Sequence, residues 1–243
     1  MRIRNAALVG AMCVGLTATL AGCGGEKKDP DAGTNGVGKL PATKIEAKAR
    51  SAANGADAVH LSGTLVTKGQ SYKLDMRLKG DGGTGQVSTK DGTFELLRVG
   101  KDLYLKAGAD FWSRQEGSKT DQAAASKLED RYVKVPVGDP SYKQLGGFTD
   151  KRVLLDGLLA MHGELATGDR GELGGVRTIR ILAAEGSGGS LDVSLEGTPY
   201  PLRLQRAGGA GVIQLTEWNK DFALAAPDKD DVVDYGRQLP SRA

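Results

Sequence analysis

The chain has few of the residues that most often carry catalysis or cross-linking. Its 243 residues include two cysteines, two histidines and only two Trp, six Tyr and four Phe. His60 and His162 have no spacing with carboxylates that indicates a metal site, and no G-x-S-x-G nucleophile elbow is present. The net charge is only +3 and the basic residues do not cluster, which argues against a nucleic-acid partner. We therefore expect no metal, no cofactor, no enzymatic activity and a mainly aliphatic core.

The first 23 residues have the pattern of a bacterial lipoprotein signal. Arg2 and Arg4 precede residues 6–22, which carry no charged side chain. A basic start, a short apolar core and small residues at the end are typical of a secretory signal peptide. The ending Leu20-Ala21-Gly22-Cys23 resembles the lipobox, in which the thiol accepts a diacylglyceryl group and the cysteine becomes the first residue after cleavage. We predict a signal peptide over residues 1–22 and lipidation of Cys23; the alternative is an ordinary secreted protein with a chance cysteine.

Lipidation would place the protein on the extracytoplasmic side of the cytoplasmic membrane, attached but not threaded through it, because two acyl chains give a stable anchor. Cleavage removes Cys13 with the signal and leaves Cys23 consumed by lipid, so the folded domain has no cysteine for a disulfide. Residues 24–40 lack apolar periodicity and are rich in Gly, Lys and Asp. We expect residues 23–40 to form the lipidated N-terminus and a flexible tether, with a typical end-to-end distance of roughly 20–25 Å.

The remaining residues predict a single α+β domain over residues 41–239. Residues 71–80, SYKLDMRLKG, alternate strictly between apolar and charged side chains, which indicates a strand with one dry face. Turn signals then recur about every ten residues, a spacing typical of antiparallel sheets. We predict helices over residues 41–57, 120–130 and 148–161, with Thr149 or Asp150 as the cap of the last. The other expected strands are GQVSTK, TFELLRV, LYLKA, FWSRQ and RYVKV, then GVRTIRILA, SLDVSLEG, YPLRLQRAG and GVIQLTEWN.

The order of several segments resembles the LppX/LprG family of actinobacterial lipoproteins, whose fold is shared with the LolA and LolB lipoprotein carriers. The resemblance runs from about Ala42 to Pro227 and implies a large, strongly curved antiparallel half-barrel wrapped over a few helices around an apolar cavity. Members of known role carry acylated lipids or lipoproteins across the envelope, although related folds also serve as sensors. The segments that carry it are AVHLSGTL, GTG, GKDLYLKAGADFW, GGFTD, ELGGVRTIRI and LTEWNKDFALAAP.

These observations favour an envelope lipoprotein that binds lipid, lipoglycan or acylated cargo in an apolar cavity. The alternative is an envelope sensor or protein-interaction lipoprotein without a transported lipid. The expected partners are a lipid or acylated glycolipid, the cytoplasmic membrane and an envelope protein. The cavity wall would come from the dry faces of the strands and the last helix: Leu61, Leu65, Tyr72, Leu74, Met76, Leu78, Phe94, Leu96, Leu103, Leu105, Leu154 and Leu158.

Overall fold

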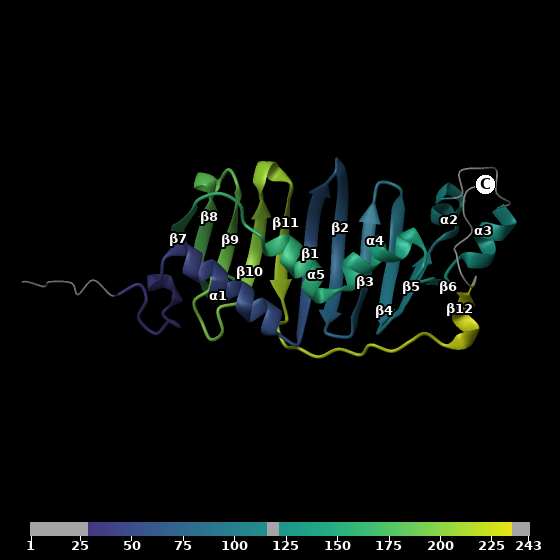
Figure 1. Ribbon diagram of the computed structural model, residues 1–243, viewed down its shortest axis with the longest axis horizontal. Helices are drawn as coiled ribbons and strands as arrows, with labels where there is room; N and C mark the ends of the chain where they lie inside the picture. The colour runs from purple at the N-terminus through teal and green to yellow at the C-terminus, as the bar shows by residue number, and fades with distance from the viewer. Residues whose placement is uncertain (1–28, 116–121, 235–243) are drawn as a thin grey trace, which may run out of the picture.

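The computed structural model describes residues 29–115 and 122–234, so the expected signal peptide and Cys23 lie outside the described part. Within it, twelve strands form one open sheet in the order β12-β6-β5-β4-β3-β2-β1-β11-β10-β9-β8-β7 (Figure 1). Neighbouring strands are antiparallel except for the short β12, which runs parallel to β6. The expected fold class, a large and mostly antiparallel sheet with a few helices, is confirmed.

The sheet consists of two sequence blocks that meet at its centre. Strand β1 pairs with β2 through a hairpin and with β11 from the far end of the chain, so Leu61 lies between Met76 and Leu215. The first block contains β1 (Ala58–Thr67), β2 (Gln70–Lys79), β3 (Gly82–Thr89), β4 (Gly92–Val99), β5 (Asp102–Ala107) and β6 (Tyr132–Val135). The second contains β7 (Leu165–Leu173), β8 (Val176–Ala183), β9 (Gly189–Ser194), β10 (Pro201–Arg206) and β11 (Gly211–Thr216), and β12 (Val232–Asp234) follows at the other edge.

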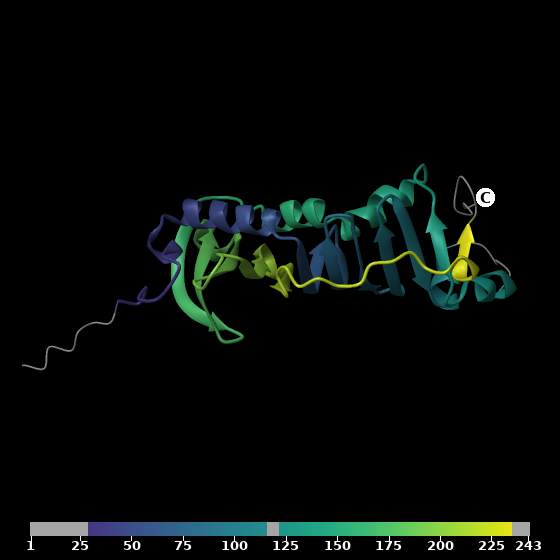
Figure 2. The same ribbon diagram turned by 90° about the horizontal axis from the view of Figure 1, so that it is seen from below.

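Helices α1, α5 and α4 cover one face of the sheet, and α2 and α3 lie at its β5–β6 end (Figure 2). Helix α1 packs on β7, β8 and β10, and α4 packs on β2, β3 and β4. The buried face of α1 includes Ile45, Ala49 and Ala53, none of which has exposed surface. The α-helices of the described residues are α1 (Ala42–Gly55), α2 (Ala109–Gln115), α3 (Gln122–Leu128), α4 (Pro140–Thr149) and α5 (Lys151–Leu159), with short 3-10 turns η1 (Val37–Lys39), η2 (Ala184–Gly186), η3 (Ala207–Gly209) and η4 (Lys229–Asp231).

The alternation predicted for β2 is confirmed, since Leu74, Met76 and Leu78 are at most 1% exposed. The helix predicted over residues 41–57 is α1, and the helix predicted over residues 120–130 is α3, with residues 120 and 121 outside the described part. Asp150 caps α5 as expected, because its carboxylate accepts a hydrogen bond from the backbone N–H of Val153 at 3.0 Å.

Several elements differ from the prediction, among them the short strand β12, which was not expected. The segment FWSRQ forms the last five residues of helix α2 and not a strand, because Phe111 and Trp112 both pack into the core from a helix that turns back over β4. Helix α4 was not expected, since Gly146 and Gly147 lower its helix propensity. Strand β7 was missed because it is an edge strand with most of its side chains exposed, and therefore lacks an apolar stripe.

The junction of α4 and α5 is fixed to the sheet by a half-buried arginine. Arg98 on β4 points toward the helices and donates hydrogen bonds to the carbonyl of Thr149 and to the carboxylate of Asp150, both at 3.3 Å. Gly83 on β3 leaves room for this junction, because a Cβ added there would lie 3.2 Å from the Thr149 carbonyl oxygen. On the other side, Lys151 of α5 donates hydrogen bonds to carbonyls at the C-terminal end of α1. These contacts determine where α4 lies above the sheet.

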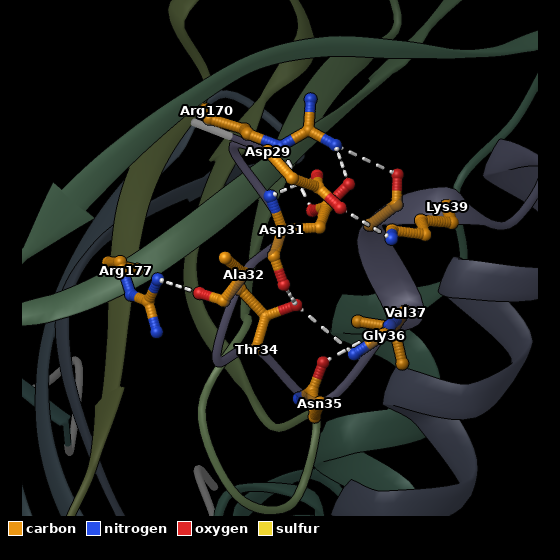
Figure 3. A network of polar contacts seen from close by, with 11 residues as sticks. Asp29, Asp31, Ala32, Thr34, Asn35, Gly36, Val37, Lys39, Arg170 and Arg177 are labelled. Carbon is orange, nitrogen blue, oxygen red and sulfur yellow. Dashed lines mark hydrogen bonds and ion pairs between the residues drawn. The ribbon is translucent and has the colours of Figure 1, made fainter. Parts of the chain in front are cut away.

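Both ends of the described chain also pack against the sheet. Residues 29–40 dock beside β7 and β8, with Val37 only 5% exposed (Figure 3). The expected flexible tether is therefore wrong for residues 29–40. After β11, residues 219–228 run in an extended conformation along the ends of the strands to β12, held in part by Lys79 against Asp221 and Phe222 (Figure 1). Residues 235–239 of the expected domain lie outside the described part.

Candidate functional site

The site lies between the sheet and helices α2 and α4, at the end of the strands opposite the extended C-terminal segment. It is a groove of about 520 Å³. We refer to it as the groove. The hairpin turns β1–β2 and β3–β4 form one side of its mouth, and α4 forms the other. The groove is lined by Gly69, Gln70, Ser71, Tyr72, Thr89, Lys90, Asp91, Phe94, Leu105, Phe111, Trp112, Ser141, Gln144, Leu145 and Phe148.

Aromatic rings make up much of its wall. Phe94 on β4 lies 5.2 Å from Phe111 on α2, measured between ring centroids, and Phe111 meets Trp112 edge-on at 5.4 Å. The indole N–H of Trp112 donates a buried hydrogen bond to the carbonyl of Ala107 at 3.1 Å, which fixes the orientation of the ring. Tyr72 on β2 faces the groove, and the centroid of its ring lies 5.8 Å from that of Phe148 on α4, so each side of the groove contributes aromatic rings.

The rim is polar and close to electrically balanced. Lys90 and Asp91 are adjacent in the β3–β4 turn and carry opposite charges. The other polar groups of the rim are hydroxyls and amides, which can donate and accept hydrogen bonds without carrying charge. They belong to Gln70, Ser71, Thr89, Ser141 and Gln144. An apolar interior with a neutral, hydrogen-bonding rim suits an amphiphile better than it suits a charged metabolite.

The structure divides the twelve predicted lining residues into three groups. Tyr72, Phe94 and Leu105 line the groove. Leu154 is half-buried against the core. The other eight are packed in the core, each at most 8% exposed: Leu61, Leu65, Leu74, Met76, Leu78, Leu96, Leu103 and Leu158. The dry faces of the central strands are thus largely packed within the core, and the open space lies under α4 and α2.

Sequence reasoning missed the groove residues that come from helices. Phe111 and Trp112 were assigned to a strand, and Leu145 lay in a segment with no predicted element. A signal for α4 was present: Asp139 precedes Pro140, an N-cap followed by a proline in the first turn, and the Asp139 carboxylate accepts from the backbone N–H of Ser141 at 2.8 Å. Tyr142, Leu145 and Phe148 then follow at helical spacing.

The two histidines lie away from the groove. His60 is on the outer face of the central strand β1, where its Nε2 lies 2.7 Å from the carboxylate of Asp75. His162 is exposed after the end of α5. Across residues 29–115 and 122–234, no group of three or more His, Cys, Asp or Glu side chains is placed to hold a metal ion. No helix in this part is long and apolar enough to cross a bilayer.

A second, smaller groove of about 380 Å³ lies where the tip of the β7–β8 hairpin approaches β10 and β11. Trp218 lines it and is held in place by a parallel stack on Tyr200, with ring centroids 4.7 Å apart, and by a hydrogen bond from its indole to the carbonyl of Pro201. Leu202 also lines this second groove. It shares no lining residue with the first groove and provides a matched surface for control variants.

The architecture corresponds to that of a solved bacterial protein. LprF from Mycobacterium bovis is 16% identical, covers 76% of this chain and 96% of its own, and superposes with a TM-score of 0.52. This chain has the LppX/LprG fold. LppX from Mycobacterium tuberculosis, a lipoprotein of the same family, is 15% identical over 75% of this chain and 99% of its own, with a TM-score of 0.42. No protein-family model matches the sequence, and no curated protein matches it.

Proposed function

We propose that the protein is a membrane-anchored envelope lipoprotein that shelters an acyl chain in the groove, with Cys23 carrying the anchor. The observation that supports this most is the groove itself, an aromatic and aliphatic space with a polar rim whose two charges, on Lys90 and Asp91, are of opposite sign, positioned by α4 and α2 above the sheet. The ligand would place its hydrocarbon among Phe94, Phe111 and Phe148. Its head group, hydroxylated as in a glycolipid, would hydrogen-bond at the rim.

The size and chemistry of the groove agree with this role. Its volume falls within the range of about 300–1,000 Å³ that is usual for small-molecule sites. Burial of each methylene contributes about 0.8 kcal/mol, so a sixteen-carbon chain offers on the order of 12 kcal/mol before ordering costs. No bond needs to be made or broken for such binding. The groove residues therefore act by excluding water.

Ligand retention tests the proposal. The protein, purified from an actinobacterial host and examined by native mass spectrometry, should carry an acyl-lipid mass, and added lipid should displace a fluorescent fatty-acid probe. Leu145→Arg places a charge inside the groove and should abolish retention, whereas Leu202→Arg in the second groove should leave it unchanged. Both leucines are partly exposed, so the two variants are matched.

A protein that comes out empty, and that does not bind the probe, would contradict lipid binding. That result would favour the alternative function, an envelope protein-interaction or sensor module. Cys23→Ala tests the anchor separately: it should prevent lipidation and release the protein from the membrane fraction or block signal processing.

A further inference from the structure

Residues 29–40, which we call the arm, are bound to the β7 end of the sheet by a clamp of two arginines (Figure 3). The side chain of Asp31 is only 5% exposed and accepts two hydrogen bonds from Arg170 of β7, at 3.2 and 2.7 Å. Such a bidentate pair is among the stronger polar contacts in proteins. Arg170 also donates to the carbonyl of Gly38 at 3.2 Å, so one guanidinium holds both ends of the arm.

The middle of the arm is fixed independently. Arg177 of β8 donates to the carbonyls of Ala32 and Gly33 at 3.0 and 2.8 Å. The side-chain amide of Asn35 donates to the carbonyls of Ser194 and Gly197, and its backbone N–H donates to the carbonyl of Leu195 at 2.8 Å. The arm therefore belongs to the folded body.

The clamp and the groove lie at different ends of the sheet. In the strand order, β2 is six places from β7 and β5 is nine places from it. With neighbouring strands about 4.8 Å apart, the groove lies roughly 30–40 Å from the β7 edge along the sheet. The arm is at the left end in Figure 1, and α2 and α4, which form the groove, lie to the right.

The arm also shortens the chain that links the fold to an anchor at Cys23. Six Cα–Cα steps separate Cys23 from Asp29, and a fully extended chain spans at most about 3.6 Å per residue, or about 20 Å in all. That reach is shorter than the distance between the β7 edge and the groove. If the arm were undocked, the extended chain from Cys23 to residue 40 would span about 60 Å, which is more than the distance between the β7 edge and the groove.

We infer that the docked arm makes the β7 end the pole that faces the anchoring membrane and carries the groove at the far pole. This inference rests on the lipidation of Cys23 proposed above. The partner of the β7 pole is the surface of the lipid bilayer. The Arg170–Asp31 clamp is the element that fixes the orientation, and acyl chains exchange at the end of the molecule that the anchor does not restrain.

Fluorescence energy transfer from the lipidated protein to an acceptor lipid in vesicles measures this orientation. The mature chain has no cysteine other than Cys23, so Glu172→Cys on β7 and Lys90→Cys at the groove rim each give a single site for a donor dye. Both side chains are exposed. We expect higher transfer from position 172 than from position 90.

Arg170→Gln removes the contacts at both ends of the arm and leaves the buried carboxylate of Asp31 without its guanidinium partner, so it should loosen the arm and lower the transfer from position 172 toward that from position 90. Arg177→Gln should act in the same direction. Arg152→Gln is the matched control, since Arg152 is exposed on α5 and far from the arm in the sequence, and it should leave both values unchanged. The mass of the N-terminal peptide and the partition of the protein into vesicles measure lipidation independently of the energy transfer. A chain without lipid would refute the anchor and the orientation together. A lipidated chain with equal transfer from the two positions, or with no response to Arg170→Gln, would refute the orientation while the anchor stands.

Discussion

Replacing Gly83 by alanine tests how the groove is held open. Gly83 lies in β3 directly below the junction of α4 and α5. A Cβ at this position would lie 2.5 Å from a methyl carbon of Leu78, 2.9 Å from the carbonyl oxygen of Arg77 and 3.2 Å from that of Thr149. Leucine can rotate, but two of the three neighbours are backbone atoms, so the sheet or the helix junction must shift.

Overpacking of this kind costs about 1–3 kcal/mol. For a domain of 150–250 residues each kcal/mol lowers the melting temperature by about 2–4 °C, so we expect a decrease of about 2–12 °C. Because the junction determines where α4 lies, Gly83→Ala should also change the affinity of the groove for a fatty-acid probe.

Gly157→Ala is the matched control, the same substitution in α5. Gly157 is exposed in a helix, and an added Cβ there meets no heavy atom within 4 Å. Removing a helical glycine stabilises by roughly 0.5–1 kcal/mol, so the melting temperature should rise. Calorimetry on the two variants should therefore give shifts of opposite sign. A Gly83→Ala protein that melts at or above the wild-type temperature would refute the packing argument.

Two further predictions concern the helices and the arm. Lys151→Met should lower the free energy of unfolding by about 1–3 kcal/mol in urea titrations, because the buried ammonium group satisfies carbonyls at the end of α1 that methionine leaves unpaired; Arg152→Met, at an exposed neighbour, should change it by less than about 0.5 kcal/mol. The arm should loosen in acid: the hydrogen bond from Lys39 holds the pKa of Asp29 below its usual 3.8, and the backbone N–H and guanidinium of Arg177 hold the pKa of Glu196 below its usual 4.5. A group whose pKa is lowered in the folded state stabilises the fold at pH values above its ordinary pKa, and this contribution is lost as the pH falls through the folded-state pKa. The NMR signal of the Asn35 amide should therefore stay in its docked position above pH 4.5 and move below pH 3.8.

Most of the fold could be predicted where side-chain periodicity reports burial on one side. Strand β2 alternates because one face meets the core and the other meets water, and α1 shows its alanine face for the same reason. Strand β7 carries no such pattern, since both of its faces are largely exposed and its place at the edge is set by pairing with β8. The arm was taken for a tether because its contacts are polar and come from Arg170 and Arg177, about 140 residues further along the chain.

The groove was harder to predict than the sheet. Periodicity identifies dry strand faces but does not say which part of them a helix covers. Leu74 and Tyr72 belong to the same stripe of β2, yet the first is buried in the core and the second lines the groove, because Tyr72 lies nearer the β1–β2 turn at the open end of the strands, whereas the junction of α4 and α5 lies over Gly83 toward the other end. Three of the expected lining residues therefore lie at the groove, whose position depends on helices that only the tertiary structure places.

Photo-crosslinking with a fatty acid that carries a diazirine near the end of its chain tests most directly that the groove shelters hydrocarbon. After irradiation and digestion, adducts should be found on the peptides that contain Tyr72, Phe94, Phe111 and Phe148, and unlabelled lipid should compete them away. Adducts spread over the outer face of the sheet, or no competable adduct at all, would contradict the account.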